Sequence, residues 1–357
     1  MLERVYYNKF IELLDFIFGP EVLEASPNFF FILASVIAAL ALFTLIAVFS
    51  LVAIYAERKI SAHIHDRLGP METGWHGLLQ TPADMIKLLL KEDIVPAAVD
   101  KKLYAIAPFV VIMAALAVFV VFPFDAGLVV SHLNIGIVYI VAISTLAVPG
   151  ILMAGWSSNN KWSLFGAVRS AAQIVSYEIP AGLAIVCVIM IAGTLNLQEI
   201  VEQQEGGLLN WFIFKSFPFN FIAFFIYFLA SLAEINRTPF DMPEAESELV
   251  AGFMTEYSGL RWGMFFLAEY GNMLAVCMII TTLFLGGWQP PLNMLGFIPG
   301  WIWFIGKSMF IVFVHIWLRF TLPRLRVDQL MYVCWKVLTP IALFCIFFIG
   351  LWQVLSN

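Results

Sequence analysis

Charge is scarce in this sequence: Asp, Glu, Lys and Arg make up 12% of its 357 residues. Soluble domains carry about 25% charged residues. Here 62% of the residues are hydrophobic, which excludes an ordinary water-soluble globular protein. Cysteine is also scarce, and the four cysteines show no CxxC or other metal-ligand spacing. We therefore expect a membrane protein that holds no metal and no iron–sulfur cluster of its own.

Long apolar runs supply the predicted membrane spans. A transmembrane helix needs about 20 mostly apolar residues. Eight such runs are present, of which the fifth is the shortest: about 29–56, 103–123, 134–155, 168–193, 217–235, 263–286, 301–320 and 336–355. No repeat of this pattern is visible, which disfavours an inverted-repeat transporter. The sequence predicts an all-α membrane protein in which residues 29–357 form a single eight-helix transmembrane domain.

Two segments are predicted to lie on the membrane surface as amphipathic interfacial helices. Residues 1–28 form an N-terminal interfacial segment with apolar side chains at helical spacing and no signal-peptide cleavage site. In the first loop, TPADMIKLLLKE predicts a helix with Thr81 as N-cap and Pro82 at its first position. Its apolar face carries Met85, Leu88 and Leu89. This helix either lines a cavity at membrane level or serves as a plain surface anchor.

Lysine and arginine are divided unevenly between the two sides of the predicted bundle. Most of them fall in alternate loops, against Arg4, Lys9 and Lys215 on the other side. Basic loops face the cytoplasm in bacterial membrane proteins. The long first and third inner loops are therefore predicted to be cytoplasmic, with both termini outside. Lys307 lies within the seventh run, where we expect it to snorkel or to pair with an acid.

The most informative segment is 232–270, LAEINRTPFDMPEAESELVAGFMTEYSGLRWGMFFLAEY, in which acids far outnumber arginines. Its carboxylates are Glu234, Asp241, Glu244, Glu246, Glu248, Glu256 and Glu269. Carboxylates at or inside a membrane are costly and mark paths for ions or protons. Arg169, Arg237 and Arg261 can pair with some of these acids but not with all. An ion pair explains any single acid as well as a proton path does, whereas the set favours a proton path.

Three predicted helices present an acid at similar depth. Glu178 lies about ten residues into the fourth run and Glu269 about seven residues into the sixth. At 1.5 Å per residue, both are roughly 10–15 Å below the inner surface. Glu234 ends the fifth run on the same side. Buried carboxyl groups of this kind can take up and release protons.

The acidic loop also contains PEAESEL, whose conformation decides where its acids point. On a helix Glu244 and Glu248 share a face and Glu246 points away, whereas in an extended segment all three line one side. A segment that changed between the two forms would re-aim Glu246. We hypothesise that such a change gates the proton path.

Several long motifs resemble one family, the quinone-site membrane subunit (H subunit) of respiratory complex I, NADH:quinone oxidoreductase. They include AEINRTPFDMPEAESELVAGFMTEYSGLRWGMFFLAEYGNM, GWSSNNKWSLFGAVRSAAQIVSYEIP, YAERK, DRLGP, GLLQ, ADMIKLLLKED, TLPRLRVDQLM and WKVLTP. The resemblance runs in chain order from about Tyr55 to Pro340. It implies a subunit of a proton-translocating enzyme that is not active alone.

The resemblance also implies partners and cofactors. Family members form much of the tunnel for a quinone (ubiquinone or menaquinone), while NADH, FMN and iron–sulfur clusters belong to partner subunits. The expected partners are the peripheral quinone-site subunits, small membrane subunits of the arm and membrane lipid, with no nucleic acid. We expect a bacterial inner (plasma) membrane rather than a mitochondrial inner membrane.

The family's functional positions transfer residue by residue. The tunnel is expected at Arg58, Arg67, Asp84 and Lys87. The start of the proton path is expected at Glu178, Glu234, Asp241, Glu244, Glu246, Glu248 and Glu269. The chain departs from the family pattern on the tunnel side, at His65, Met71, Glu72, Trp75 and Thr81. These departures concern the quinone species and the tunnel shape.

Three other functions are consistent with parts of the pattern. The chain could be the related subunit of a membrane-bound hydrogenase or formate hydrogenlyase, which its electron-input partners would reveal. It could be a free-standing proton or ion transporter, which would move protons when purified alone. It could be a passive membrane anchor, in which case its carboxylates could be neutralised without effect.

Overall fold

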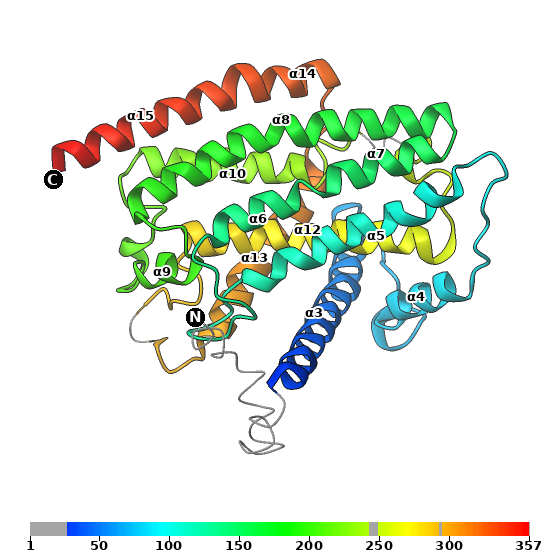
Figure 1. Ribbon diagram of the computed structural model, residues 1–357, viewed down its shortest axis with the longest axis horizontal. Coiled ribbons are helices and arrows are strands. Elements are labelled where there is room, and N and C mark those ends of the chain that lie inside the picture. Colours follow the sequence, from blue (N-terminus) through cyan, green and yellow to red (C-terminus); the bar gives the residue numbers. More distant parts are fainter. Residues whose placement is uncertain (1–26, 243–248, 293–294, 357) are drawn as a thin grey trace.

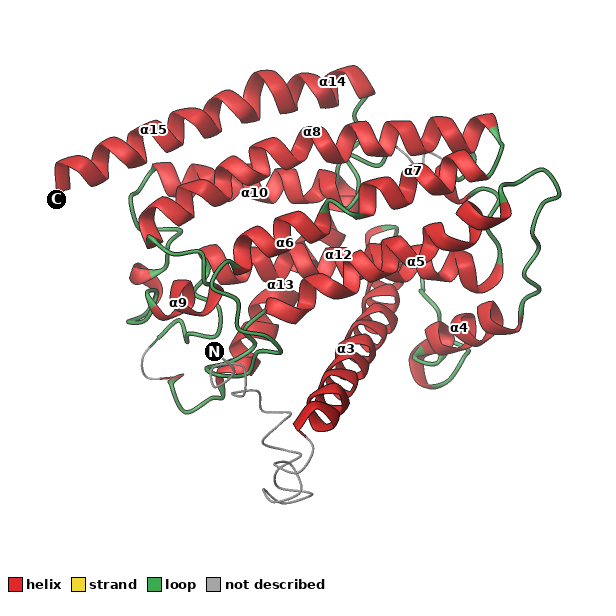
Figure 2. Ribbon diagram, viewed as in Figure 1, coloured by secondary structure: helices red, strands yellow, loops and turns green. Residues whose placement is uncertain are grey.

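The computed structural model describes residues 27–242, 249–292 and 295–356, and in these residues the regular elements are helices (Figures 1 and 2). Within these described ranges, seven helical stretches are long and apolar enough to cross a membrane. They are α3 (Pro27–Ile64), α5 (Lys101–Ala117) with the 3-10 turn Val118–Val121, α6 (Gly136–Ser144) with α7 (Ala147–Ser157), α8 (Lys161–Ala192), α12 (Gly259–Phe284), α13 (Gly300–Thr321), and α14 (Val327–Tyr332) joined through the π-helical turn Val333–Leu338 to α15 (Thr339–Ser356). The prediction of an all-α membrane protein is confirmed.

The fifth apolar run forms a shorter helix than the other seven. This helix, α10 (Phe219–Glu234), has 16 residues and is therefore about 24 Å long, below the roughly 30 Å of a bilayer core. Irregular backbone is tolerated at membrane depth only where protein buries it or where it lines a water-filled cavity. Of the non-helical residues before α10, Trp211, Phe212 and Ile213 are buried, whereas Phe214 and Phe217 are exposed. Among the described residues, seven helical stretches rather than eight therefore reach spanning length.

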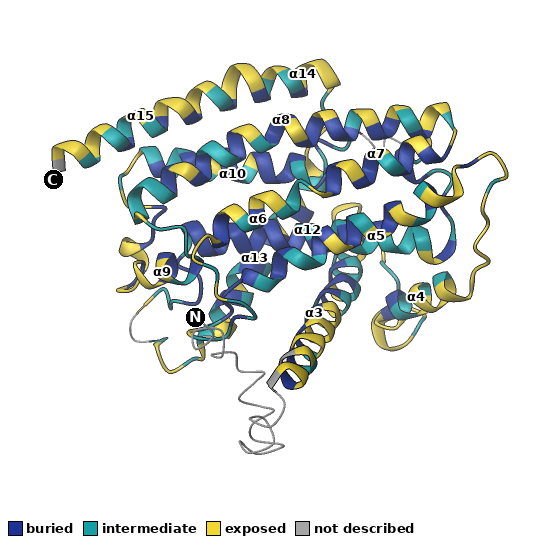
Figure 3. Cartoon of the chain, in the orientation of Figure 1, coloured by how far each residue is buried: buried dark blue, intermediate teal, exposed yellow. Residues whose placement is uncertain are grey.

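The helices form one bundle around α12. In Figure 1, α8 lies between α15 and the layer formed by α7 and α10, and α12 runs through the middle. Burial agrees with these positions. The central helix α12 is mostly buried, whereas α15 and much of α3, at the outside of the bundle, expose apolar side chains (Figure 3). The first half of α3 diverges from the other helices. Exposed apolar surface on a spanning helix is suited to lipid or to partner helices.

Local sequence signals explain several helix ends and one close approach. Asp100 caps α5 by accepting hydrogen bonds from the first-turn amides, and Asn160 caps α8 in the same way. Gly193 ends α8 with a φ of 69°, a conformation that favours glycine. Inside α8, a Cβ on Gly166 would lie 2.6 Å from the Cα of Gly252. Because Gly166 has no side chain, the segment around Gly252, between α10 and α12, packs directly on α8.

The predicted interfacial helix of the first loop is present as α4 (Gln80–Leu90). Its predicted N-cap is wrong, because the helix begins two residues earlier than expected, at Gln80 instead of Pro82. Leu79 is the capping position, without a side-chain cap, and Thr81 is buried inside the first turn. The side chains of Thr73 and Gln80 hydrogen-bond at 2.8 Å where the helix starts. The interfacial helix predicted within residues 1–26 lies outside the described residues.

Candidate functional site

Arg237 is the centre of a buried charged cluster. Its side chain is almost fully buried, 2% exposed, with one guanidinium nitrogen 2.8 Å from Glu57 of α3 and another 2.9 Å from Glu269 of α12. The guanidinium also lies 4.7 Å from the ring centre of Tyr270. Burial alone would lower the pKa of Arg237, but the charges of Glu269 and Glu57 raise it well above its ordinary value. The guanidinium therefore stays charged inside the protein.

The turn that carries Arg237 is held by α8. Asn236 adopts a left-handed conformation with a φ of 52°, and the Arg237 amide donates to the Leu232 carbonyl at 3.1 Å. The amide nitrogen of the buried Gln173 side chain donates to the carbonyls of Ala233 and Phe240 at 2.8 and 2.7 Å. These bonds clamp both sides of the turn and fix where the guanidinium points.

Glu57 completes the cluster. It accepts a hydrogen bond of 2.7 Å from the Tyr270 hydroxyl and forms an ion pair with Arg319 of α13. Glu57, Arg237, Glu269 and Arg319 therefore form a charge-balanced set of two carboxylates and two guanidiniums, called the charged quartet below. Buried charges are tolerated when they are paired in this way; Glu57 is also hydrogen-bonded, whereas the Arg237 nitrogen that faces Glu269 makes an ion pair without hydrogen-bond geometry.

Glu57 is the buried acid that sequence reasoning missed. It belongs to the AERK motif at the C-terminal end of the first predicted span, where charged residues are commonly taken to mark the end of a helix. In the structure α3 continues through it to Ile64, so Glu57 is inside a helix and packed against the bundle. A helical pattern that continues beyond residue 56 was the signal that could have identified Glu57 as a residue inside the helix.

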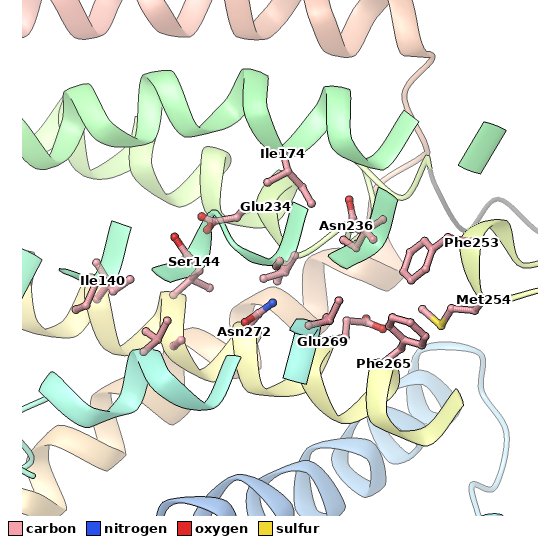
Figure 4. A pocket seen from close by; sticks show the side chains of 18 residues that line it. Ile140, Ser144, Ile174, Glu234, Asn236, Phe253, Met254, Phe265, Glu269 and Asn272 are labelled. Carbon is pink, nitrogen blue, oxygen red and sulfur yellow. The ribbon is translucent and has the colours of Figure 1, made fainter. Parts of the chain in front are cut away.

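A small cavity lies on one side of the charged quartet. It has a volume of about 60 Å³, and its polar lining includes Ser144, Glu234, Asn236, Glu269 and Asn272 (Figure 4). A buried water needs roughly 10–15 Å³ and several polar partners. The cavity can therefore accommodate a few waters between Glu234 of α10 and Glu269 of α12.

Glu178 of α8 is near Glu234, which lines this cavity. Its carboxyl is close enough to Glu234 for their charges to repel each other. Its Oε1 atom is buried without a hydrogen-bond partner among the described residues. The structure thus brings the three acids predicted at similar depth into one neighbourhood. Of these three acids, Glu269 is the one that an arginine of the quartet holds.

The other predicted acids lie elsewhere. Asp241 pairs with Arg324 at 3.0 Å; burial raises the pKa of Asp241 although the charge of Arg324 opposes this shift. Glu244, Glu246 and Glu248 fall outside the described residues, so the gating hypothesis for PEAESEL stays a prediction. The two other candidate arginines differ: Arg261 pairs with Asp93 at 3.0 Å, and Arg169 lies 5.0 Å from the Phe165 ring.

Two larger cavities lie on the other side of the quartet. The first has a volume of about 510 Å³ and a polar wall made by Glu57, Arg58, Arg67, Gln80, Tyr270 and Arg319. The second has a volume of about 450 Å³ and a mainly apolar wall from α3, α4, α5 and α12. Ile54, Arg58 and Phe266 line both, so the cavities adjoin. Their size is that of small-molecule sites, which span about 300–1,000 Å³.

The predicted tunnel residues gather at these two cavities. Arg58, Asp84 and Lys87 line the apolar cavity, and Arg67 lines the polar one. Asp84 pairs with Arg58 at 2.7 Å and lies 3.7 Å from Lys87. Partial burial would raise the pKa of Asp84, but the hydrogen bond from Arg58 and its charge outweigh burial and lower it. Since α4 lines this cavity, the alternative of a plain surface anchor is not needed to explain its apolar face.

Lys307 behaves differently from both expectations. Its ammonium donates to the carbonyls of Leu285, Gly287 and Gln289 at 2.7 to 2.9 Å. These carbonyls lie at and just beyond the end of α12, where the helix dipole is negative. The cation is therefore satisfied by backbone, and among the described residues it forms no ion pair with an acid.

Comparison with known proteins gives one consistent result. Residues 36–350 match the family model described as NADH dehydrogenase. The H subunit of NADH-quinone oxidoreductase from Chlorobaculum tepidum is 52% identical over 331 residues, covering 89% of this chain and 92% of that protein. The H subunit from Chlorobium luteolum is 54% identical over 331 residues, covering 89% of each chain. The second H subunit from Geobacter metallireducens is 47% identical over 339 residues, covering 89% and 95%.

Proposed function

Because this chain belongs to the NADH dehydrogenase family, whose matched relatives are named as H subunits of NADH-quinone oxidoreductase, we propose that it forms quinone-binding and proton-coupling parts of such an enzyme. In this proposal the chain is a multi-pass membrane subunit, inactive by itself. Partner subunits supply NADH binding, FMN and the iron–sulfur clusters. Its basic loops face the cytoplasm of a bacterial cell.

The two large cavities support the quinone half of the proposal. The apolar cavity between α3, α4 and α12 suits an isoprenoid tail, and the polar cavity suits a ring that carries two carbonyl oxygens. Arg58 lies where the two cavities meet, and Arg67 and Gln80 also face the polar one. These side chains are hydrogen-bond donors, which quinone oxygens require. Both ubiquinone and menaquinone have this chemistry.

The single observation that carries the coupling half is the position of the charged quartet. Glu57 lines the polar cavity, Glu269 lines the small inner cavity, and Arg237 binds both carboxylates. Quinone reduction brings negative charge and consumes protons at one end of this set. A change in charge near Glu57 would alter the hold of Arg237 on Glu269. Protons would then move between Glu269, Glu234 and Glu178.

Neutralising the two acids that lie outside the quartet tests the coupling half. In the assembled enzyme we expect Glu178→Gln and Glu234→Gln to leave assembly and NADH oxidation by an artificial acceptor unchanged. Quinone-linked turnover and proton movement should fall at least about tenfold, because proton transfer by a positioned side chain typically accelerates a reaction about 10²–10⁴-fold. Asp93→Asn, at a half-exposed surface pair with Arg261, is the matched control. Wild-type turnover and pumping in both glutamate variants would refute a proton path here.

A cavity-filling variant tests the quinone half separately. Leu88 of α4 lines the apolar cavity, and Leu88→Trp would fill part of it. We expect a raised KM for quinone with unchanged electron entry from NADH. An unchanged KM would place the quinone tail elsewhere. Purified alone, the chain should give no proton flux in vesicles, in contrast to a free-standing transporter.

A further inference from the structure

His315 is a buried imidazole that the proposed path does not use. It lies on α13 and is 1% exposed. Its Nδ1 is 3.4 Å from the sulfur of Cys277 on α12, and its ring centre is 4.9 Å from that of Phe228 on α10. Its Nε2 is buried and has no hydrogen-bond partner in the part of the chain that the structure describes.

A purely structural role does not account for this side chain. A buried polar atom without a partner costs about 1–3 kcal/mol, and a leucine or phenylalanine would fill the same space without that cost. Each buried unsatisfied group in a native protein therefore calls for a specific explanation. An atom that takes up a proton during the working cycle is one such explanation, because it cannot be permanently paired.

The position of His315 links it to the charged quartet. It lies four residues before Arg319, one helical turn away on the same face of α13. Arg237 is close enough for its charge to act on the imidazole. On α12, Cys277 is two turns from Tyr270, which binds Glu57. Among the described residues, the charged and titratable groups of this region include Glu57, Tyr227, Glu234, Arg237, Glu269, Cys277 and Arg319.

We propose that His315 is a proton-accepting residue that exchanges one proton with the carboxyl groups of the charged quartet. The inference rests on the proposed coupling function and adds a site to it. In the forward step an O–H bond of Glu57 or Glu269 breaks and an N–H bond forms at Nε2 of His315. A carboxylic acid and a neutral imidazole become a carboxylate and an imidazolium, so the total charge is conserved.

The surroundings of His315 suit both states. When a quartet carboxyl holds the proton, the quartet carries one net positive charge and repels a second cation at His315. When the proton has moved, the quartet is neutral and that repulsion falls. The imidazolium then donates its Nδ1–H to the Cys277 sulfur, and the Phe228 ring is near enough to attract the cation. Quartet and imidazole therefore hold the proton alternately.

The test uses His315→Gln and His315→Asn in the assembled enzyme. We expect normal NADH oxidation by an artificial acceptor, fewer protons moved per electron pair, and a quinone-linked pH profile displaced by at least about one pH unit. Ser308→Ala is the matched control, because Ser308 is buried on α13 and bonds Thr281 rather than the His315 pair. A purely structural role would lower the amount of enzyme but leave its pH profile unchanged.

The outcomes separate this inference from the proposed function. A wild-type pH profile and proton ratio in His315→Gln would overturn the inference, while loss of pumping in Glu234→Gln would leave the proposed function standing. Wild-type behaviour in all of these variants would overturn both. If the histidine variants do not assemble, Cys277→Ala removes the partner of Nδ1 without adding volume to this buried position. An unchanged pH profile in Cys277→Ala would then refute the inference.

Discussion

Arg237→Gln is the change that tests the charged quartet most directly. Arg237 is the ion-pair partner of Glu269 and one of two arginines that hold Glu57. In the variant Glu57 keeps Arg319 and the Tyr270 hydroxyl. Glu269 loses its guanidinium and becomes a buried carboxylate without a cation at hydrogen-bond distance.

The magnitude follows from these partners. Removing one member of a buried ion pair costs about 3–5 kcal/mol, because the other charge is left uncompensated. Arg237→Gln combined with Glu269→Gln removes that charge as well and leaves Glu57 and Arg319 balanced. The remaining cost is the charged hydrogen bond to Glu57, about 1.5–3 kcal/mol. The double variant should therefore be more stable than the single variant and less stable than the wild type.

Thermal denaturation of the assembled enzyme in detergent measures this order. The midpoint is taken as the temperature at which half of the complex has lost its subunits on size-exclusion chromatography. We expect wild type above the double variant and the double variant above Arg237→Gln. A single variant as stable as wild type, or a double variant below the single one, would show that Arg237 does not compensate Glu269.

Two smaller changes test other parts of the structure. Asp84→Asn should cost less than about 1 kcal/mol, because its pair with Arg58 is partly exposed. Because the pKa of Asp84 is lowered, the ionised Asp84 stabilises the folded protein above the ordinary carboxyl pKa, and this stabilisation is lost as the pH falls through the lowered value. The melting midpoints of variant and wild type should therefore converge in acid. A difference that widens in acid would contradict this. Gly166→Ala should destabilise the folded protein by about 1–3 kcal/mol, because the added Cβ would lie 2.6 Å from the Gly252 backbone. Gly182→Ala on the same helix is the control: its Cβ would meet no atom within 4 Å, so this variant should be as stable as wild type or slightly more stable. Equal midpoints for the two glycine variants would show that the loop on α8 yields to the methyl group.

Several errors of sequence reasoning share one cause, which is that helix ends depend on neighbours. The fifth apolar run is long enough to be counted as a span, yet α10 begins only at Phe219, because Pro218 is its N-cap and Ser216 has a φ of 59°, which a right-handed helix does not accommodate. Thr81 has the residue type of an N-cap, yet the Thr73–Gln80 hydrogen bond accompanies an earlier start. Lys307 was expected to find water or an acid, and the end of α12 supplied carbonyls instead.

The site itself was predicted in part. Glu234 and Glu269 were identified as acids at similar depth, and the structure lines one cavity with both. Their proton-path role stays a prediction. Glu57 was missed as a buried acid, and the sequence pattern gave His315 no role. Nothing in the local sequence around His315 indicates that Cys277 faces it or that Arg237 is near.

Hydrophobic run lengths and long motifs were sufficient to establish the membrane class and the family, because both are properties of contiguous residues. The partners of each charge depend on how the helices are rotated and packed. Arg237 and Glu57 are separated by 180 positions in the chain, and they meet only because α3 and the turn after α10 converge on α12. Tertiary structure therefore decided which acids are balanced by arginines and which of them face a cavity.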